Sequence, residues 1–281
     1  MKNLVILGAG TAGTMMANHL VKKLNKKDWQ ITLVDQFKSH YYQPGFLFIP
    51  FGTYQPEDVK RTIDEFLPKG IQLIREKIDR IDKDTDTVIL ENGRNVKYDI
   101  LIIATGCKIA PEEVPGMKGD TWQKNIFDFY TFEGSCALAK KLETWPGGKL
   151  VVHITEMPIK CPVAPLEFAF LADAYFQKKG VRDQVDITYV TPLSGAFTKE
   201  FTSKTLKYLL EDKKHKYDLL IGTSTGSLLI PHLALGDVDK IRRIYTNVTM
   251  DEIFDINPFV VKQKDDIDLV SINHFNVILQ F

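Results

Sequence analysis

A strand, a tight turn and a helix at the start of the chain constrain its fold more than any other feature. Residues 3–7 form an apolar run, and the glycines that follow stand at Gly8, Gly10 and Gly13 in the pattern G-x-G-x-x-G. Gly8 allows the backbone to turn tightly, Gly10 leaves room for a pyrophosphate against the main chain, and Gly13 lets the next helix pack closely. The pattern predicts a dinucleotide-binding turn. The alternative is an ordinary tight turn between a strand and a helix.

An acidic residue supports the dinucleotide-binding interpretation. A second apolar strand is predicted at residues 30–34, and Asp35 ends it, where a carboxylate can bind both hydroxyls of a ribose. That negative charge argues against a cofactor with a 2′-phosphate. Thr11 and Ala12 precede the predicted amphipathic helix Met15–Leu24, and the N–H groups at a helix start can face phosphates.

The composition excludes several classes of function. Lys plus Arg and Asp plus Glu number 36 each among 281 residues, so no basic surplus is present and nucleic acid is not expected as a partner. The N-terminus enters a strand without a basic leader, and no apolar run has the length of a membrane span. We therefore expect a cytoplasmic chain, at most peripherally attached to the inner face of a membrane. The three cysteines, Cys107, Cys136 and Cys161, are too scattered for a metal site or a disulfide framework.

The rest of the first half follows an α/β pattern. A loop rich in aromatic residues at Ser39–Phe46, which includes Gln43, leaves the carboxyl edge of the sheet and forms either a cofactor wall or a hydrophobic flap. An apolar strand at Tyr98–Ala104 runs into Thr105 and Gly106. The other elements predicted here are an amphipathic helix at 55–66, a strand at 71–76 and a hairpin of strands at 77–82 and 87–91.

A second α/β unit begins at about residue 120 and repeats this order of elements. It is predicted to contain a helix at 132–144, a strand at 149–154, a helix at 166–179 and a strand at 186–190. The turn after its first strand, residues 155–162, contains no glycine, so its backbone cannot approach a pyrophosphate closely. We expect this unit not to bind a nicotinamide cofactor, so that something other than NADH supplies electrons.

Cys161 is the candidate reactive thiol. It lies between Lys160 and Pro162 at the start of the predicted helix, and both a helix N-terminus and an ammonium group favour a thiolate. The alternative is that Cys161 is a small buried hydrophobic residue.

About residues 1–200 resemble the sulfide:quinone oxidoreductase and flavocytochrome c sulfide dehydrogenase flavoproteins. The resemblance rests on the opening glycine turn, Tyr41–Gly45, Ala104–Gly106, Pro158–Glu167, and Thr191–Pro192 followed by Ala196–Phe197. It implies an FAD cofactor, a small-molecule sulfur donor, and a quinone or other electron acceptor. It also implies peripheral membrane contact, and it leaves a homo-oligomer open.

The resemblance also assigns roles to individual residues. Cys161 would attack or carry sulfur near the flavin, and Glu167 could act as a general base. Gly8, Gly10, Thr11, Ala12, Gly13, Asp35, Gln43, Thr105 and Gly106 would bind FAD, and no metal is expected. Type II NADH dehydrogenases are disfavoured because the second phosphate loop lacks glycines. The C-terminal third of the family pattern is not recognisable, so the fold is expected to be C-terminally incomplete.

The last part of the chain has a different signature. A predicted strand at 217–221 runs into Gly222-Thr223-Ser224-Thr225-Gly226, the G-x-S-x-G pattern of a nucleophile elbow. Residues 206–262 resemble the patatin-like acyl hydrolases, in which Ser224 would be the nucleophile. The glycine-rich oxyanion loop and the aspartate motif of that family are missing, and a serine hydrolase needs both a base and oxyanion donors.

Together these features predict an α/β protein with two Rossmann-like dinucleotide-binding units of the FAD/NAD(P)-binding fold, followed by a short patatin-like fragment. The expected domains are an FAD-binding domain at 1–110, a second Rossmann-like domain with the redox cysteine at 111–205, and the fragment at 206–281. The expected function is FAD-dependent oxidation of sulfide or a related sulfur species. The alternatives are a serine acyl hydrolase that uses Ser224 and an inactive fusion product.

Overall fold

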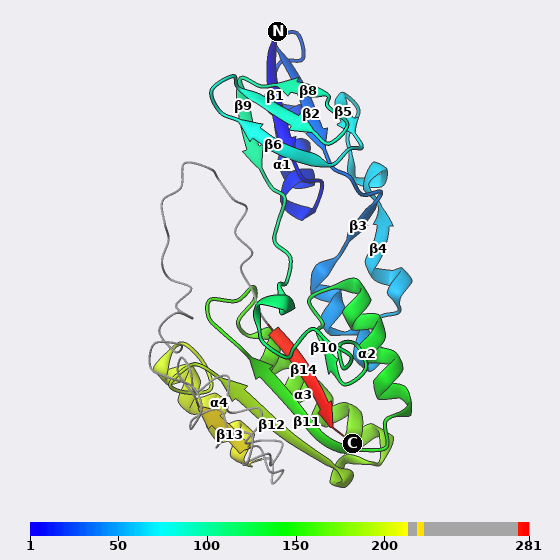
Figure 1. The fold of residues 1–281 in the computed structure, drawn as a ribbon, viewed down its shortest axis with the longest axis vertical. Helices are drawn as coiled ribbons and strands as arrows, with labels where there is room; N and C mark the ends of the chain where they lie inside the picture. Colours follow the sequence, from blue (N-terminus) through cyan, green and yellow to red (C-terminus); the bar gives the residue numbers. More distant parts are fainter. Residues whose placement is uncertain (213–217, 222–274, 281) are drawn as a thin grey trace. The chain divides into compact units, whose positions relative to one another are not determined.

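The computed structural model describes residues 1–212, 218–221 and 275–280, and it divides into two compact units (Figure 1). Unit 1 consists of Met1–Gly45 and Tyr54–Gly106, and unit 2 consists of Phe46–Thr53 and Cys107–Phe281. The short segment Phe46–Thr53 therefore leaves unit 1 and belongs to unit 2.

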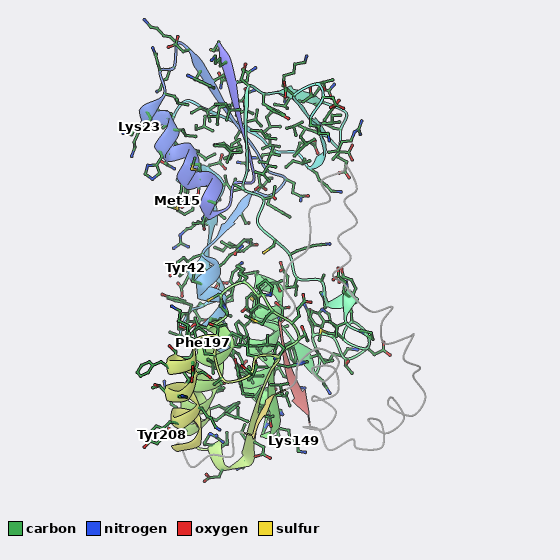
Figure 2. All side chains as sticks on the ribbon, turned by 90° about the vertical axis from the view of Figure 1, so that its left-hand side faces the viewer. Met15, Lys23, Tyr42, Lys149, Phe197 and Tyr208 are labelled. Atoms are coloured by element: carbon green, nitrogen blue, oxygen red, sulfur yellow. The ribbon has the colours of Figure 1, made fainter. Side chains whose placement is uncertain are left out.

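Unit 1 is built on a parallel four-stranded sheet in the order β5-β2-β1-β9. Its strands are β1 (Lys2–Leu7), β2 (Trp29–Val34), β5 (Ile71–Ile74) and β9 (Ile100–Ile103). The helix α1 (Thr11–Lys23) connects β1 to β2. Its residues Met15 and Lys23 are labelled on one side of the unit in Figure 2, and Met15 is exposed. The strand, the turn and the helix predicted from the glycine pattern are confirmed.

Residues Leu4–Leu7 of strand β1 are apolar because both faces of this part of the strand are covered. Leu4 and Ile6 pack with Ala17 of α1 on one face. The alternate residues Val5 and Leu7 pack on the other face, in a cluster that includes Val88 and Leu90. Those two residues belong to a separate antiparallel sheet of β6 (Ile78–Asp82), β7 (Thr87–Leu90) and β8 (Asn95–Lys97). The predicted hairpin is confirmed, and β8 is an additional strand.

The helix predicted at residues 55–66 is wrong. This segment forms two short 3₁₀ turns, η3 (Pro56–Val59) and η4 (Ile63–Phe66), separated by the strand β4 (Lys60–Thr62). Strand β4 pairs with β3 (Ser39–Tyr41), which lies in the loop predicted at Ser39–Phe46. The turn η1 (Gln43–Leu47) begins in the same loop, and η2 (Ile49–Phe51) follows it.

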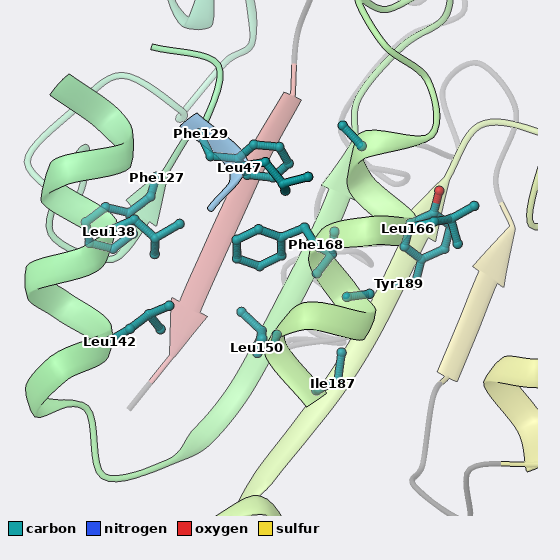
Figure 3. Packing of buried hydrophobic residues seen from close by; sticks show 14 of the residues in the cluster. Leu47, Phe127, Phe129, Leu138, Leu142, Leu150, Leu166, Phe168, Ile187 and Tyr189 are labelled. Carbon is teal, nitrogen blue, oxygen red and sulfur yellow. The ribbon is translucent and has the colours of Figure 1, made fainter. Parts of the chain in front are cut away.

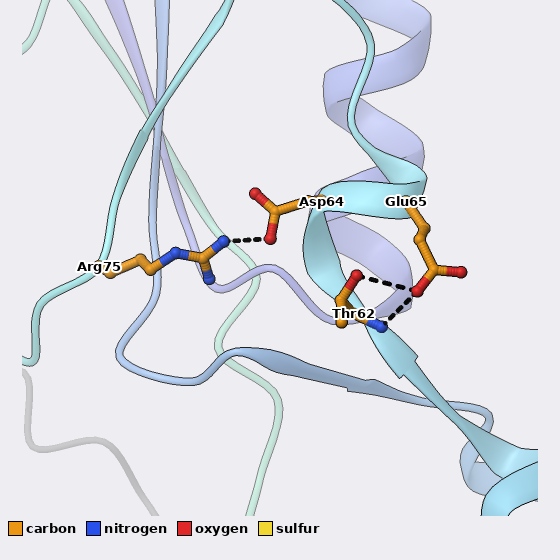
Figure 4. A network of polar contacts seen from close by, with 4 residues as sticks. All are labelled: Thr62, Asp64, Glu65 and Arg75. Atoms are coloured by element: carbon orange, nitrogen blue, oxygen red, sulfur yellow. Dashed lines mark hydrogen bonds and ion pairs between the residues drawn. The ribbon is translucent and has the colours of Figure 1, made fainter.

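Local caps explain why one continuous helix does not form. Glu65 Oε1 accepts bonds from the backbone N–H of Thr62 at 3.0 Å and from the Thr62 hydroxyl at 2.9 Å, and this starts a new turn at Thr62 (Figure 4). Arg75 also pairs with Asp64 of η4 (Figure 4). Because Thr62 has extended backbone angles, it ends one element and caps the next.

Unit 2 is built on a five-stranded sheet in the order β10-β14-β11-β12-β13. Strands β11, β12 and β13 are parallel, and β14 runs antiparallel to both of its neighbours. The bounds are β10 (Ile126–Phe127), β11 (Gly148–Ile154), β12 (Val185–Thr191), β13 (Asp218–Ile221) and β14 (Phe275–Gln280). The helices are α2 (Phe132–Thr144), α3 (Ala164–Lys179) and α4 (Glu200–Asp212), with 3₁₀ turns η5 (Pro111–Glu113) and η6 (Arg182–Gln184). The predictions at 132–144, 149–154, 166–179 and 186–190 are confirmed within a few residues.

The core of unit 2 contains the segment that leaves unit 1. Phe168 of α3 is fully buried and stacks on Phe129, with the ring centroids 4.8 Å apart (Figure 3). Leu47 belongs to the same cluster, and the Phe51 ring lies 5.0 Å from that of Phe168. Apolar contact of this kind explains why Phe46–Thr53 folds with unit 2.

A buried ion pair joins the C-terminal half of α3 to the residues that follow the helix. Arg182 Nε lies 2.6 Å from Asp173 Oδ1, and the two side chains are 8% and 0% exposed. Gln177 Nε2 donates to the other carboxylate oxygen at 2.9 Å, and Arg182 Nη1 donates to the carbonyl of Val185 at 2.6 Å. The pair links the end of α3 to the start of β12.

Candidate functional site

The glycine turn of unit 1 has the close backbone approaches that the sequence pattern requires. Gly8 has φ of +93°, and a Cβ atom there would lie 2.4 Å from the carbonyl oxygen of Ala104. A Cβ atom on Gly13 would lie 1.8 Å from the carbonyl oxygen of Gly8. A side chain at either position would force the strands and α1 apart, so the turn depends on both glycines.

Gly10 differs from its two neighbours in the motif. It is exposed, and a Cβ atom there would meet no atom within 4 Å. No side chain caps α1, its first turn has no acidic residue, and the N–H of Thr14 is bonded to Gly10 O at 3.0 Å. The N–H groups of Thr11, Ala12 and Gly13 precede that bond, so they remain for an anion at the helix start.

Asp35 lies directly after β2 and is bonded to the glycine turn. Its Oδ2 accepts a hydrogen bond from the N–H of Ala9 at 2.6 Å, and its Oδ1 accepts one from the N–H of Phe37 at 2.8 Å. Each carboxylate oxygen has a second lone pair, so the group can still accept two ribose hydroxyls. The structure thus brings Asp35 and the glycine turn together at the carboxyl end of β1 and β2.

His40 is a contact that the sequence analysis did not assign to the site. Its Nδ1 lies 3.1 Å from the carbonyl oxygen of Ala9, and its ring centroid lies 4.4 Å from that of Phe66. Its place in the aromatic loop after β2 was the available signal. The contact holds that loop against the turn.

The other residues predicted to bind the cofactor lie at element ends. Gln43 is the exposed first residue of η1, while Thr105 and Gly106 follow β9 and are also exposed. The carbonyl of Ala104, just before them, borders Gly8. The structure therefore places Thr105 and Gly106 directly after the residue that contacts the glycine turn.

Cys161 of unit 2 lies in the loop between β11 and α3, and its side chain is exposed. Its backbone has φ of +54°, a conformation uncommon for residues other than glycine. The Cys161 carbonyl accepts hydrogen bonds from the N–H of Ala164 at 3.0 Å and from the Tyr130 hydroxyl at 3.2 Å. These two bonds fix the backbone from which the thiol projects, and Cys161 is not a buried hydrophobic residue.

Charged and titratable groups surround Cys161. Burial lowers the pKa of the half-buried Lys160, while electrostatic interaction with Cys107 and Cys161 opposes that change. Burial also raises the pKa of Tyr130, and the negative charges of Cys161, Tyr189 and Glu167 raise it further. Glu167, in the first turn of α3 and exposed, thus lies within electrostatic reach of the same tyrosine as Cys161.

The predicted nucleophile elbow lies outside the residues that the structure describes. It consists of Ser224 with Gly222 and Gly226. Within residues 1–212, 218–221 and 275–280, no cluster of three or more His, Cys, Asp or Glu side chains suits a metal ion. In the same part of the chain, no helix combines the length and apolar character needed to cross a bilayer.

A family model described as pyridine nucleotide-disulphide oxidoreductase matches residues 2–152, more than half of the chain. The chain belongs to this family. The match includes the glycine turn, Asp35 and the sheet of unit 1. The fold is accordingly the α/β fold of FAD/NAD(P)-binding oxidoreductases, with parallel strands in its sheets.

Several of the proteins that this chain is similar to are sulfide:quinone oxidoreductases. The chain is 31% identical over 200 residues to a sulfide-quinone reductase of Aquifex aeolicus, which covers 70% of this chain and 45% of the relative. It is 25% identical over 214 residues to a mitochondrial sulfide:quinone oxidoreductase of Dictyostelium discoideum, covering 75% and 46%. The solved Aquifex aeolicus sulfide:quinone oxidoreductase has a TM-score of 0.65 at 24% identity and covers 79% of this chain and 52% of its own. The chain spans about half the length of these relatives.

Proposed function

We propose that this chain is an FAD-dependent oxidoreductase of the sulfide:quinone oxidoreductase type. It oxidises sulfide or a related sulfur species through Cys161 and passes electrons through FAD to a quinone or other acceptor. The main support for the proposal is the exposed thiol of Cys161, next to Lys160, in a chain whose relatives include sulfide:quinone oxidoreductases. The glycine turn of the same chain has the close backbone approaches that a dinucleotide-binding turn requires.

The residues of the glycine turn fit the ADP half of FAD. The open space at Gly10 is the cradle that a side chain would fill, and the N–H groups of Thr11, Ala12 and Gly13 can bind the pyrophosphate. The carboxylate of Asp35 can accept the ribose hydroxyls while it holds the N–H of Ala9. Gln43, Thr105 and Gly106 complete the proposed set. When bound, FAD supplies a two-electron acceptor.

The residues around Cys161 prepare the thiol for sulfur chemistry. Lys160 directly precedes Cys161 in the sequence, and a neighbouring ammonium group is one feature that favours the thiolate, the nucleophilic form of cysteine. Tyr130 holds the backbone of Cys161 through its hydroxyl. Glu167 lies near the same tyrosine and can accept a proton from incoming hydrogen sulfide, which leaves hydrosulfide as the nucleophile.

The finer architecture is also part of the proposal. Strands β11 and β12 are parallel and are joined through α3, which supports a second Rossmann-like unit. Its turn at residues 155–162 has no glycine, so we propose that it does not bind NADH. We further propose a cytoplasmic chain that attaches peripherally to a membrane and can self-associate. Flotation with anionic vesicles and light scattering of the purified chain test these two properties.

Anaerobic reduction of the bound flavin tests the function. The purified chain is loaded with FAD, and sulfide is added while the flavin absorbance is recorded. We expect bleaching in the unmodified chain and in Cys136→Ser, a control for the half-buried cysteine of α2, but not in Cys161→Ser. Equal bleaching of all three proteins would contradict the role of Cys161. A folded chain that binds no flavin would contradict the whole proposal.

A serine acyl hydrolase remains an alternative from the sequence alone. Strand β13 ends at Ile221, directly before the predicted nucleophile elbow, and extends the sheet as its outermost strand beside β12. Labelling by a fluorophosphonate probe that is lost in Ser224→Ala would support this alternative, together with the patatin-like fragment that we place at residues 206–262.

A further inference from the structure

We propose that His40 is a positioning residue for the phosphates of FAD, an inference that rests on the proposed binding of FAD at the glycine turn. Its imidazole holds the peptide group between Ala9 and Gly10 in the orientation that leaves the Gly10 N–H free for an anion. His40 lies outside the glycine motif, and all of the contacts that support this role belong to unit 1.

Both backbone polar groups of Ala9 are held by side chains. The Ala9 N–H donates to Asp35 Oδ2 at 2.6 Å, and the Ala9 carbonyl oxygen lies 3.1 Å from His40 Nδ1. Because a carbonyl oxygen can only accept, Nδ1 carries the proton in this hydrogen bond. Ala9 is 1% exposed, so loss of the imidazole would leave its carbonyl as a buried acceptor without a partner.

The hydrogen bond from His40 determines where the next N–H points. The peptide group between Ala9 and Gly10 is planar and trans, so the Gly10 N–H points opposite to the Ala9 carbonyl and away from His40. Gly10 is exposed, and among the described residues no protein group accepts a hydrogen bond from its N–H. The Gly10 N–H is therefore a further donor beside those of Thr11–Gly13 at the start of α1.

The absence of a side chain on Gly10 makes this peptide group easy to turn over. Gly10 has φ of −70°. A flip of the peptide group would rotate this angle by half a turn to a positive value, which costs little for glycine. The flip would also put the Ala9 carbonyl oxygen where the Gly10 N–H now lies, and its partial negative charge would repel a phosphate. Since Gly10 itself offers little resistance to the flip, the hydrogen bond from His40 supplies the restraint.

His40 is itself held in place by two elements of unit 1. Its backbone lies in β3, which pairs with β4 so that His40 is opposite Arg61. Its ring centroid lies 4.4 Å from that of Phe66, the last residue of η4. The Phe66 carbonyl accepts a hydrogen bond from Asn18 Nδ2 of α1 at 2.7 Å. Contacts thus run from α1 through η4 and His40 back to Ala9, which leaves the imidazole little freedom to move away from the turn.

Two matched variants isolate the hydrogen bond from the rest of the side chain. His40→Asn keeps a donor, because Nδ2 of asparagine is attached to Cγ as Nδ1 of histidine is. His40→Leu has the same branching at Cγ but no donor, and both variants lack the aromatic ring. A difference between them therefore reports the hydrogen bond and not the loss of ring packing. If His40→Leu does not fold, His40→Ala also lacks the donor and replaces it.

Selective isotope labelling observes the peptide group directly in the flavin-free chain. The sequence has two Ala-Gly pairs, Ala9–Gly10 and Ala12–Gly13. Carbonyl-¹³C alanine and ¹⁵N glycine therefore give two signals in an amide–carbonyl correlation spectrum, and Ala12→Ser identifies the second by its loss. We expect the Ala9–Gly10 signal to stay sharp in His40→Asn and to shift or broaden in His40→Leu. The Ala12–Gly13 signal should be the same in both.

ADP binding measures the consequence for the phosphate site. ADP is the probe because it contains the half of FAD that the glycine turn is proposed to hold. By calorimetry we expect its dissociation constant to rise about tenfold in His40→Leu, which corresponds to about 1.4 kcal/mol, and to stay close to the original value in His40→Asn. The control is His19→Leu, at an exposed histidine of α1, which should bind ADP as the unmodified chain does.

Three outcomes separate this inference from the proposed function. Equal ADP affinities or equal Ala9–Gly10 signals in His40→Leu and His40→Asn would overturn the role of His40, even if sulfide reduces the bound flavin. ADP binding that depends on the His40 donor, in a chain whose flavin ignores sulfide, would support His40 and contradict the sulfur chemistry alone. A folded chain that binds neither ADP nor FAD would contradict both.

Discussion

Replacing Asp173 by leucine should destabilise unit 2 by about 3–5 kcal/mol. The Asp173 side chain is 0% exposed, and it is the partner of the Arg182 guanidinium, which is 8% exposed. In Asp173→Leu, Arg182 retains the bond to the Val185 carbonyl, but its charge stays buried without a counter-ion. Arg182 Nη2 already has no hydrogen-bond partner within the described residues. The loss is a large part of a total stability of about 5–15 kcal/mol.

A variant without either charge shows whether the loss of stability in Asp173→Leu comes from the unpaired charge or from lost packing. In Asp173→Leu/Arg182→Met the interior holds no unpaired charge, and such replacements are often neutral or stabilising. The double-mutant cycle should therefore give an interaction energy of several kcal/mol. With an m value of roughly 2 kcal/mol per molar urea, the midpoint of urea unfolding should be about 2 M lower in Asp173→Leu, as followed by circular dichroism.

An exposed carboxylate provides the control. Asp183→Leu, in η6 beside the pair, should change stability by less than about 0.5 kcal/mol. The reasoning would be refuted if Asp173→Leu cost under about 1 kcal/mol, or if the double variant were as unstable as the single one.

Three further predictions concern other parts of the molecule. Gly13→Ala should lower the melting temperature of the flavin-free chain because its Cβ would meet Gly8 O, whereas Gly10→Ala should leave that temperature unchanged and weaken FAD binding in a fluorescence titration. Burial raises the pKa of Asp128 to about 6, so the fold favours its protonated form, and stability should fall by about 3 kcal/mol from pH 4 to 6 and then level off. Urea unfolding of Asp128→Asn at several pH values should lack this fall. Phe168→Ala should cost about 3–5 kcal/mol in the same assay, since the ring is fully buried, and a cost below 1 kcal/mol would contradict the packing.

Elements with a strong periodic pattern could be predicted from the sequence. The apolar run before Gly8 and the helix at 132–144 are confirmed because each depends on local patterning, and the latter begins where the Thr131 hydroxyl accepts a bond from the N–H of Gly134. The segment 55–66 was predicted wrongly because its periodicity is helical. In this segment β4 pairs with β3, about 20 residues earlier in the sequence, and this pairing outweighs the local preference for a helix.

Some residues of the candidate site could likewise be predicted from the sequence, and others could not. The positions of Gly8, Gly13 and Asp35 followed from a motif with fixed spacing, and the structure brings them together. The contact of the Tyr130 hydroxyl with the Cys161 carbonyl had no such signal, because it joins two loops that are 31 residues apart in the sequence. Contacts between segments far apart in the sequence cannot be read from local patterns.

Because the segment Phe46–Thr53 belongs to unit 2, the chain passes from one unit to the other three times, at residues 45/46, 53/54 and 106/107. A gene fragment that begins at Cys107 would lack Leu47 and Phe51, which the aromatic cluster of Phe168 requires. An exchange of unit 2 by recombination would therefore have to include this octapeptide together with the segment that begins at Cys107. A truncated version made without it should expose the vacated apolar surface and associate with itself.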